Sequence, residues 1–488
     1  MANTKLKSTP KSLPTAEWIL WLIVLFLAVR AAYLVHSEFV RVTCPCQVQQ
    51  DEALHVDFGR RIALGESPYV DFRNGGPYVH CSYPPLYYLL MALGLRHGVG
   101  LFESGRWVSW FGFFALLAML FFWTFRRSAG PWKFLGPLLV ANAPTWVVWG
   151  TVDRSDALSI AFNLASLLVW MLVVEQQKPE SRKAKGAAWI AGLLHALALL
   201  TKQTTLLLGV AVLAAGIVRK RPKTTGAFLL AAWGTAGLAA GLLVLGTHGL
   251  FWDHTVVWAR SYFEWTRLAE FLVQSWAPEC GALAILGVLA LWKGTTVPLI
   301  LRILLTLETL SLFSLGRVGS AENYYMEFLL VLVLVLGEAL SRPDPNSGKS
   351  IRWVIVGLLA VTLFQWGLQK PRVPGNTEIN QKHQAAALLE GHGPVLLIDS
   401  DLALMSGREV WYHPSTFQVL FAMRAWDAST LVREIKEHRL DWAEVYDEPD
   451  QGRIPTPVIQ ALAEDYRIVS RSYGRLWLKP KAGTPQKP

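Results

Sequence analysis

An acidic pair stands out soon after the first membrane-length apolar segment of this chain, within the run Gln49-Gln50-Asp51-Glu52. The loop that carries the pair is expected to lie outside the cytoplasm, and further apolar segments follow it. Asp-Glu is also a common helix start, because carboxylates interact favourably with the positive end of the helix dipole. The outward position favours chemistry, so we interpret Asp51 and Glu52 as a candidate site at the outer face of a bilayer.

Further acid, base and amide residues occur where other apolar segments should reach the same membrane depth. These stretches are Arg106, which starts the second span, Thr151-Val152-Asp153-Arg154-Ser155-Asp156, Thr201-Lys202-Gln203 and Gly319-Ser320-Ala321-Glu322-Asn323-Tyr324-Tyr325. Lys202 interrupts a continuous apolar run, which favours a function over simple snorkelling from a helix end. Arg154 and Asp156 have an equally good alternative, which is to pair with each other. Glu322 and Asn323 have the alternative of an interfacial belt with the tyrosines that follow them.

The composition sets the class of protein that must position these residues. The chain has 488 residues, of which 52% are hydrophobic and 17% are charged, and its mean hydropathy is +0.32. These values exclude an ordinary soluble enzyme and predict a polytopic α-helical membrane protein. Segments long enough for a helix to cross the hydrocarbon core recur through the first three quarters of the chain. They predict eleven spans, at 17–36, 107–125, 133–150, 157–174, 187–201, 204–218, 226–246, 280–292, 296–315, 325–340 and 351–368.

Basic residues collect in alternate loops, which predicts that these loops are cytoplasmic. They are Lys5, Lys7, Lys11, Arg126, Arg127, Lys133, Lys178, Arg182, Lys183, Lys185, Arg219, Lys220, Arg221, Lys223, Arg342, Lys349 and Arg352. We therefore predict a cytoplasmic leader at 1–16 and a membrane domain at 17–370 with outer loops 37–106 and 247–279. The part at 371–488 then lies outside the cytoplasm. The net charge of +10 follows mostly from this bias and needs no nucleic acid partner.

The tail at 371–488 differs from the rest, because short apolar runs alternate there with amphipathic stretches. The patterns predict strands at 394–398 and 442–446 and helices at 429–438 and 456–466. We expect a small extracytoplasmic α/β domain. No glycine-rich phosphate loop or acid/base cluster is apparent in it, so a structural or acceptor-contacting role is the default.

The four cysteines, Cys44, Cys46, Cys81 and Cys280, all fall in outer segments or at the outer membrane edge. This distribution fits an oxidising compartment and favours a disulfide from Cys81 to Cys44 or Cys46. Free thiols are the alternative. A zinc site is disfavoured, because zinc requires four ligands and the sequence has no second closely spaced cysteine pair.

The order of these motifs resembles the GT-C superfamily of polyprenyl-phosphate-sugar glycosyltransferases, in the branch with protein O-mannosyltransferases and lipid A aminoarabinose transferases. The resemblance rests on the acidic pair after the first span, Tyr83-Pro84-Pro85-Leu86-Tyr87-Tyr88, Arg154-Ser155-Asp156-Ala157-Leu158, Thr201-Lys202-Gln203 and the outward α/β tail. Each motif is short, and their order and sidedness along nearly the whole chain carry the likeness.

The resemblance implies transfer of a sugar from a lipid monophosphate carrier to a glycan, lipid or protein acceptor outside the cytoplasm. It gives Asp51 the role of general base, with Glu52 assisting, in an inverting displacement. Cations that could bind the donor phosphate without a metal are Lys202, Arg154 and Arg106, and supporting residues are Asp156, Gln203, Glu322 and Asn323. No cofactor is required, although His55 or His80 could join the acidic pair in holding a divalent metal.

Two other classes remain open from the sequence. A secondary transporter would explain the spans, but it should show an internal repeat and ionisable residues near the membrane centre. A non-catalytic polysaccharide assembly or export subunit would explain everything except the clustered acid and base residues. The expected location is a bacterial inner membrane with the site facing outward. Neither the sugar, a hexose or a pentose, nor the acceptor can be read from these residues.

Overall fold

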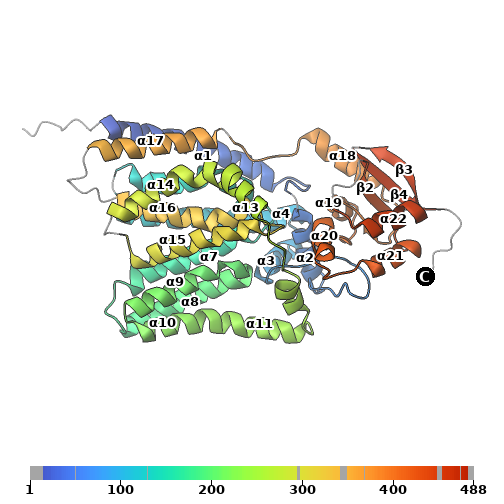
Figure 1. Ribbon diagram of the computed structural model, residues 1–488, viewed down its shortest axis with the longest axis horizontal. Helices are drawn as coiled ribbons and strands as arrows, with labels where there is room; N and C mark the ends of the chain where they lie inside the picture. Colours follow the sequence, from blue (N-terminus) through green and yellow to red (C-terminus); the bar gives the residue numbers. More distant parts are fainter. Residues whose placement is uncertain are drawn as a thin grey trace, which may run out of the picture.

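The predicted membrane spans are helices packed side by side in a bundle. A computed structural model describes residues 15–49, 51–128, 130–293, 297–340, 349–367, 369–447, 453–472 and 474–481. The bundle helices are α1 (Thr15–Val42), α4 (Leu101–Arg127), α5 (Trp132–Asn142), α6 (Pro144–Trp149), α7 (Asp156–Val169), α8 (Arg182–Thr201), α9 (Leu207–Val218), α10 (Pro222–Leu229), α11 (Thr235–Gly246), α14 (Ala277–Lys293), α15 (Leu299–Ser311), α16 (Met326–Leu340) and α17 (Lys349–Trp366). Figure 1 shows them running roughly parallel in one part of the molecule. Each of the eleven predicted spans coincides with one or more of these helices.

Length and apolarity make this a polytopic α-helical membrane protein. Among the described residues, seven helical stretches have the length and hydropathy needed to cross a bilayer. They are Ala16–Val42, Leu101–Arg127, Asp156–Val174, Arg182–Thr201, Pro222–Gly246, Trp265–Trp292 and Leu299–Gly316. Shorter apolar helices, at Leu86–Arg96, Gln203–Val218 and Trp353–Trp366, supplement them.

Two helix boundaries differ from the sequence prediction. The span predicted at 133–150 divides into α5 and α6 on either side of Ala143, because Pro144 cannot donate a backbone hydrogen bond to continue α5. The helix predicted at 280–292 begins as far back as Trp265, through α13 (Trp265–Glu270) and the π-helical turn η5 (Phe271–Trp276). The last part of the expected outer loop 247–279 is therefore helical.

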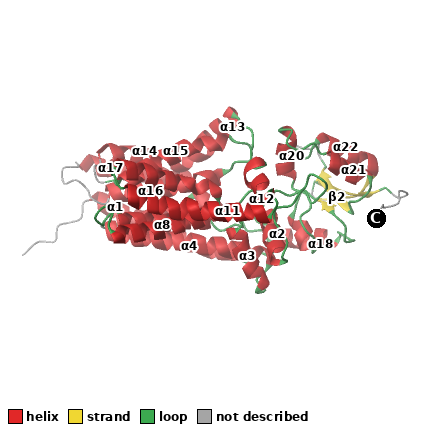
Figure 2. Ribbon diagram, turned by 90° about the horizontal axis from the view of Figure 1, so that it is seen from below, coloured by secondary structure: helices red, strands yellow, loops and turns green. Residues whose placement is uncertain are grey.

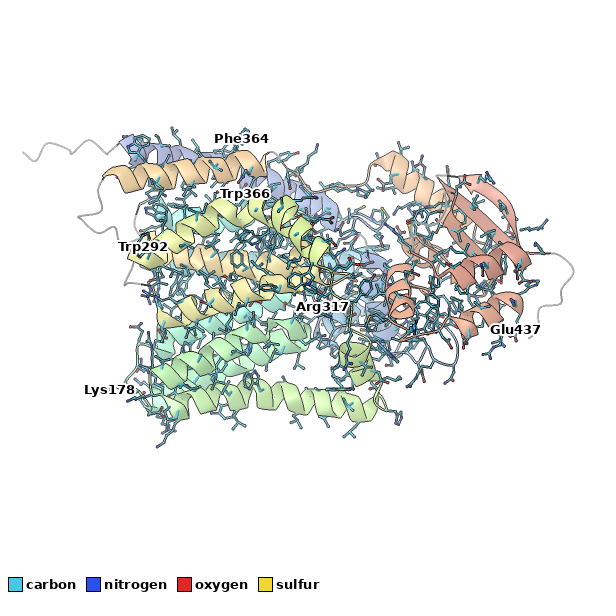
Figure 3. The ribbon with its side chains drawn as sticks, in the orientation of Figure 1. Lys178, Trp292, Arg317, Phe364, Trp366 and Glu437 are labelled. Carbon is cyan, nitrogen blue, oxygen red and sulfur yellow. The ribbon has the colours of Figure 1, made fainter. Side chains whose placement is uncertain are left out.

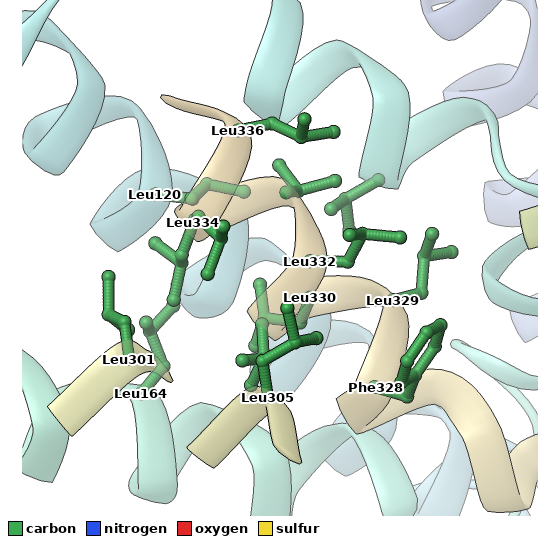
Figure 4. Packing of buried hydrophobic residues seen from close by; sticks show 14 of the residues in the cluster. Leu120, Leu164, Leu301, Leu305, Phe328, Leu329, Leu330, Leu332, Leu334 and Leu336 are labelled. Atoms are coloured by element: carbon green, nitrogen blue, oxygen red, sulfur yellow. The ribbon is translucent and has the colours of Figure 1, made fainter. Parts of the chain in front are cut away.

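Helix α16 lies at the centre of the bundle and has apolar side chains on all sides, as expected for a helix surrounded by protein. Figure 4 shows Leu330 and Leu334 of α16 among Leu164 of α7 and Leu301 and Leu305 of α15. All these residues are buried in one hydrophobic cluster. This packing fixes the helix ends that carry the polar residues described below.

The basic loops and the C-terminal part lie at opposite ends of the bundle. Figure 3 places Lys178, from a loop predicted to be cytoplasmic, at the end farthest from Glu437 in the C-terminal part. The predicted leader, of which residues 1–14 are not described, and Arg342 lie outside the described residues. The loop with Lys178 and the C-terminal part therefore lie at opposite ends of the bundle, as the distribution of basic residues predicts.

The first outer loop forms two helices between the bundle and the C-terminal part (Figure 1). They are α2 (Glu52–Ala63) and α3 (Leu86–Arg96). The sequence predicted the first of them as an amphipathic helix lying on the membrane surface. Instead, α2 packs against α3 and α4 and most of its side chains are buried, so it is part of the protein core.

The C-terminal part is a small α/β domain and holds the only strands of the described chain, drawn yellow in Figure 2. Its sheet has the order β1-β2-β4-β3, with β1 and β2 parallel and the other pairs antiparallel. The strands are β1 (Val395–Leu396), β2 (Trp442–Tyr446), β3 (Tyr466–Ser472) and β4 (Arg475–Pro480), and the helices are α18 (Asn376–Ala387), α19 (Asp401–Met405), α20 (Pro414–Ala422), α21 (Ser429–Lys436) and α22 (Thr456–Asp465). The four elements predicted from the tail sequence, namely β1, β2, α21 and α22, are confirmed.

The C-terminal domain is fastened to the first outer loop by backbone and side-chain bonds. Tyr78 N–H donates to the carbonyl of Trp411 at 2.6 Å, and His413 N–H donates to the carbonyl of Tyr78 at 3.0 Å. Arg61 of α2 donates to Glu409 at 2.8 Å. The segment before α20 is thus held against α2 and the first outer loop.

The predicted disulfide between Cys81 and Cys44 or Cys46 is absent, because all three are free cysteines. The Cys44 and Cys46 sulfurs are 3.5 Å apart, whereas a disulfide needs about 2.05 Å. The Cys81 thiol donates instead to the carbonyl of Tyr83 at 3.6 Å. All four cysteines are free thiols in buried positions.

Candidate active site

Asp51 lies just before α2, in the left-handed backbone region with φ 72° and ψ −4°. Non-glycine residues adopt this conformation rarely, and such cases cluster at functional sites. The side chain is 33% exposed, and the guanidinium Nη1 of Arg154 is 3.9 Å from Oδ2. The imidazole Nε2 of His413 lies 3.0 Å from Oδ1. The C-terminal domain therefore reaches the carboxylate singled out by the sequence.

Charged and hydrogen-bonding neighbours keep Asp51 ionised. Burial acts to raise the pKa of this carboxyl, but the hydrogen bond and charge of His413 and the charges of Arg154 and His55 outweigh burial and lower it to about 2. Burial has the opposite effect on the next histidine, since it lowers the pKa of His55 to about 3. At neutral pH the pair is an anionic Asp51 beside an uncharged His55.

A second carboxylate, Asp156 at the start of α7, gathers the cations predicted from distant loops. Lys202 Nζ forms a short ion pair with Asp156 Oδ1, and the amide of Asn323 donates to the same oxygen at 2.9 Å. Arg154 Nε lies 3.5 Å from Oδ2. The structure therefore brings Asp51, Arg154, Asp156, Lys202 and Asn323 into one cluster.

Lys202 is buried at a break between two helices. α8 ends at Thr201, and the short 3-10 helix η2 (Gln203–Leu206) follows before α9 begins. The amide of Asn163 caps the break by donating to the carbonyl of Thr205 at 3.0 Å. The ammonium group lies 5.5 Å from the ring centre of Tyr83 and 5.4 Å from that of Tyr324, within the range of cation–π attraction.

Arg154 has unused hydrogen-bonding capacity. Its guanidinium stacks over Trp149 at 5.1 Å and contacts two carboxylates at ion-pair distance. Its buried Nε nevertheless has no hydrogen-bond partner among the described residues. Nε faces Asp156 Oδ2 at 3.5 Å, and this oxygen also lacks a hydrogen bond from the residues that the structure describes. A buried, unsatisfied donor is costly, so this position favours a closer anionic acceptor.

Glu52 and Arg106 lie next to the cluster but are bonded to each other. Both side chains are 0% exposed, and Arg106 Nη2 lies 2.8 Å from Glu52 Oε2. Arg106 also donates to the carbonyls of Arg41, Cys44 and Cys46, while Glu52 accepts from the backbone of Val48, Gln49 and Asp153. This burial argues against the predicted roles of Arg106 in phosphate binding and of Glu52 in proton transfer. The pair acts as a clamp that fixes the loop before α2.

The two remaining predicted residues occupy different positions. The amide of Gln203 donates to the carbonyls of Ser82 at 2.7 Å and Thr255 at 3.3 Å, so it ties two outer loops together. Glu322, next to Asn323, lines a cavity of about 270 Å³. Gln203 is therefore a scaffold residue, and Glu322 faces open space.

The cavity adjoins the charged cluster through three of its wall residues. Gln49 precedes Asp51 by two positions, Trp149 lies under Arg154, and Glu322 precedes Asn323. Its walls also include Gln274, Gln365, Gln369 and Trp366. Amides exchange hydrogen bonds with hydroxyl groups, and aromatic faces pack against the apolar faces of rings. A cavity lined in this way has the groups to hydrogen-bond and stack on a polar ring compound such as a sugar.

The histidines considered as metal ligands have other partners. His55 Nδ1 is 2.9 Å from the hydroxyl of Tyr88, and His80 Nε2 is 2.7 Å from the carbonyl of His254. Within the described ranges, no group of three or more His, Cys, Asp or Glu side chains is arranged to hold a metal ion. The carboxylates Asp51 and Asp156 are instead matched by cations.

His413 is the site residue that the sequence did not reveal. It follows the short segment 410–412 and precedes Pro414, which begins α20. Neither its spacing nor its neighbours distinguish it from an ordinary buried histidine. Only the return of the C-terminal domain onto the first outer loop places it against Asp51.

Comparisons with known proteins agree with this architecture. A family model described as "Predicted membrane protein (DUF2142)" matches residues 64–255. Among curated proteins, no sequence matches the chain. Solved structures with a similar fold include ArnT from Cupriavidus metallidurans bound to undecaprenyl phosphate, with a TM-score of 0.61 and 16% identity over 96% of this chain and 99% of ArnT. The same protein in the apo state gives a TM-score of 0.60 at 14% identity, covering 93% and 97% of the two chains.

A second solved structure comes from an archaeon. The Archaeoglobus fulgidus oligosaccharyltransferase, in complex with zinc and sulfate, has a TM-score of 0.56 and 11% identity over 91% of this chain and 71% of the other. The identities are low, so the comparison concerns the arrangement of helices and domains. ArnT and the oligosaccharyltransferase are both GT-C enzymes. The chain therefore has the fold of the GT-C membrane glycosyltransferases, completed by a small C-terminal α/β domain.

Proposed function

We propose that this protein is a membrane glycosyltransferase that moves a sugar from a polyprenyl-phosphate donor to an acceptor hydroxyl outside the cytoplasm. The observation that carries the proposal is Arg154, whose buried Nε has no hydrogen-bond partner among the described residues. Its guanidinium lies 3.9 Å from Asp51 and stacks over Trp149, a wall residue of the cavity lined by amides and aromatic rings. An ArnT structure of the same fold contains undecaprenyl phosphate, which supports a lipid monophosphate as the donor carrier. The site would face outward from a bacterial inner membrane, since the basic loop at Lys178 lies at the opposite end.

The proposed reaction is one displacement at the anomeric carbon. The acceptor oxygen bonds to this carbon while its bond to the phosphate oxygen breaks, and the electron pair leaves with the polyprenyl phosphate. Arg154 and Lys202 stabilise the charge that develops on the phosphate, and Asp51 receives the acceptor proton. A single displacement inverts the anomeric configuration.

The low pKa of Asp51 fits a late proton transfer. A carboxylate with a pKa of about 2 is a weak base towards a free hydroxyl. The hydroxyl becomes strongly acidic as its oxygen bonds to the sugar carbon, so a weak base in the right position is sufficient. Orientation of Asp51, rather than high basicity, is then the main requirement of the site.

We further propose that the reaction needs no divalent metal. Arg154 and Lys202 lie in one cluster with Asp51 and Asp156, and these two cations can supply the positive charge that a donor phosphate requires. Purified protein treated with a chelator should keep its transfer rate. A rate that falls with the chelator and returns with a divalent ion would contradict this proposal.

The test of the proposed function is reconstitution of the purified protein in lipid with synthetic undecaprenyl-phosphate sugars. Each sugar is offered with short saccharide, lipid and peptide acceptors, and products are identified by mass spectrometry. Transfer from a lipid-linked sugar, with the matching glycan missing from cells that lack the protein, supports the proposal. Transfer from a nucleotide sugar but from no lipid-linked sugar would contradict it.

A further inference from the structure

We propose that His413 of the C-terminal domain is a positioning residue that sets the orientation and the charge of Asp51. The inference rests on the proposed glycosyl transfer and adds the C-terminal domain to its active site. Its basis is the 3.0 Å contact between His413 Nε2 and Asp51 Oδ1, which joins residues 362 positions apart in the sequence.

The hydrogen-bond partners fix the protonation of the imidazole ring. A carboxylate only accepts hydrogen bonds, so Nε2 carries the proton and donates it to Asp51. Nδ1 lies 2.7 Å from the hydroxyl of Thr416, which holds the ring from its other side. Thr416, His413 and Asp51 therefore form a chain that leads from α20 to the carboxylate.

This chain selects one oxygen of the carboxylate for catalysis. Oδ1 is occupied by His413, and Oδ2 faces Arg154 at 3.9 Å, beyond hydrogen-bonding distance. Oδ2 is thus the oxygen left to accept a proton from the acceptor hydroxyl. A carboxylate held at one oxygen loses rotational freedom, so its other oxygen is directed at the reacting group.

The segment that carries His413 is rigidly attached. His413 itself is buried, its backbone N–H is bonded to Tyr78, and Phe417 of α20 packs on Phe72 of the first outer loop with ring centres 4.8 Å apart. An alanine substituted for Gly76 would place its Cβ 2.3 Å from the ring of Trp411, so the two segments are in close contact. Removal of the imidazole leaves these contacts and should leave the domain docked.

Titratable groups from three elements face Asp51, and they determine what happens when His413 is removed. These groups are His413 from the C-terminal domain, Arg154 from the loop before α7 and His55 from α2, of which His55 is uncharged at neutral pH. In His413→Ala the hydrogen bond and charge that lower the pKa of Asp51 are lost, while Arg154 remains. The pKa of Asp51 then rises, so the acid limb of the rate profile moves to higher pH.

The experiment compares the wild-type protein with His413→Ala, His413→Gln and Thr416→Val in the reconstituted transfer assay. His413→Ala should lower kcat by about 10- to 100-fold, the range found when the hydrogen-bond partner that orients a metal-ligating side chain is removed. KM for the lipid donor should change little, because Arg154 and Lys202 are intact. His413→Gln, whose amide can still donate to Asp51, should recover much of the rate. The kcat of Thr416→Val should lie between those of His413→Ala and His413→Gln.

Ser415→Ala is the matched control, because Ser415 neighbours Thr416 on the same turn and its side chain makes no hydrogen bond within the described part of the chain. It should behave like the wild type. A His413→Ala variant with normal kcat and an unmoved acid limb would overturn the inference. Equal losses in His413→Ala and His413→Gln, with KM raised in both, would also overturn it, since they indicate a general structural defect.

Thermal unfolding of Asp51→Ala, His413→Ala and the double variant, each of which removes the hydrogen bond, tests the contact without any substrate. Residues in contact produce a double-variant shift that differs from the sum of the single shifts. Additive shifts would overturn the inference even if sugar transfer is observed. If the wild type transfers no lipid-linked sugar, the proposed function fails, and non-additive shifts would still establish that His413 holds Asp51.

Discussion

At the scale of single residues, the proposed mechanism assigns proton transfer to Asp51 and phosphate binding to Arg154 and Lys202. Asp51→Asn should abolish sugar transfer and keep donor binding, because the amide cannot accept the proton and the cations facing the phosphate remain. The measurement is turnover with the lipid-linked sugar beside binding of undecaprenyl phosphate to the same preparation. Near-normal turnover of Asp51→Asn would exclude Asp51 as the base.

The cations should act on binding as well as on rate. Lys202→Ala or Arg154→Ala should weaken binding of undecaprenyl phosphate, because each removes a charge-assisted contact worth about 1.5–3 kcal/mol, or about one to two orders of magnitude in affinity. Lys382→Ala is the matched control, since Lys382 also pairs with a buried aspartate, Asp401 at 2.6 Å, but lies in the C-terminal domain. Unchanged affinity in both site variants would place the phosphate elsewhere.

The sequence predicted the charges of this site better than its hydrogen bonds. Asp51, Arg154 and Lys202 could be predicted because charged residues at the ends of apolar runs are costly and therefore conspicuous. Arg106 and Glu52 also lie at the ends of apolar runs, yet they form a buried ion pair with each other. A pattern shows that a charge needs a partner, but it does not show whether that partner is protein or substrate.

At the scale of elements, the Glu52–Arg106 pair should stabilise the junction of α2 and α4. Glu52→Ala breaks the buried hydrogen-bonded pair and leaves Asp153, 3.6 Å from Arg106 Nε, as the nearest carboxylate. Breaking a buried pair typically costs about 3–5 kcal/mol of folding free energy, and the nearby Asp153 makes this an upper range here. We expect a clear drop in the thermal midpoint of the purified protein. Glu322→Ala is the control, because it only enlarges the cavity that Glu322 lines, and it should change the thermal midpoint little.

A partner substitution separates a structural clamp from a catalytic residue. Replacing both members with apolar residues, as in Glu52→Leu with Arg106→Met, removes both buried charges and should recover part of the lost stability. Transfer activity should return together with stability if the pair is only structural. A stable double variant that remains inactive would restore Glu52 to the catalytic group.

The positions of the helices could largely be predicted from the sequence, but whether a helix is covered by lipid or by protein could not. Apolar length predicted every bundle helix, but the amphipathic pattern of α2 is the same for a helix on a membrane as for one covered by protein. The break before α6 has a local cause in Pro144. The burial of α2 depends on α3, α4 and the C-terminal domain, which lie far from it in the sequence.

At the scale of the whole molecule, the fold makes a prediction about topology. Reporter fusions at Gln177 and Arg221 should report a cytoplasmic location, and fusions after Pro374 an outward one, because basic loops stay inside. The fusions are checked with paired reporters that are active on opposite sides of the membrane. A cytoplasmic signal after Pro374 would place Asp51 and His413 on the cytoplasmic side and contradict an outward-facing site.

The division of the chain into membrane bundle and α/β domain could be predicted from the change in composition near residue 371. The docking of the two parts could not, because it depends on the bridge between Tyr78 and Tyr412 and on aromatic contacts such as Phe72 with Phe417. Aromatic residues near a membrane surface are expected in any case as interfacial anchors. Their alternative role as a domain interface has no separate sequence pattern.

The bridge between Tyr78 and Tyr412 also bears on how the protein is made. A ribosome releases Asp51 early and His413 only after more than four fifths of the chain has been synthesised. A nascent or truncated chain can therefore contain all its bundle helices and still lack the histidine that contacts Asp51. On the proposed role of His413, chains that stall before this point would occupy the membrane without a correctly oriented Asp51.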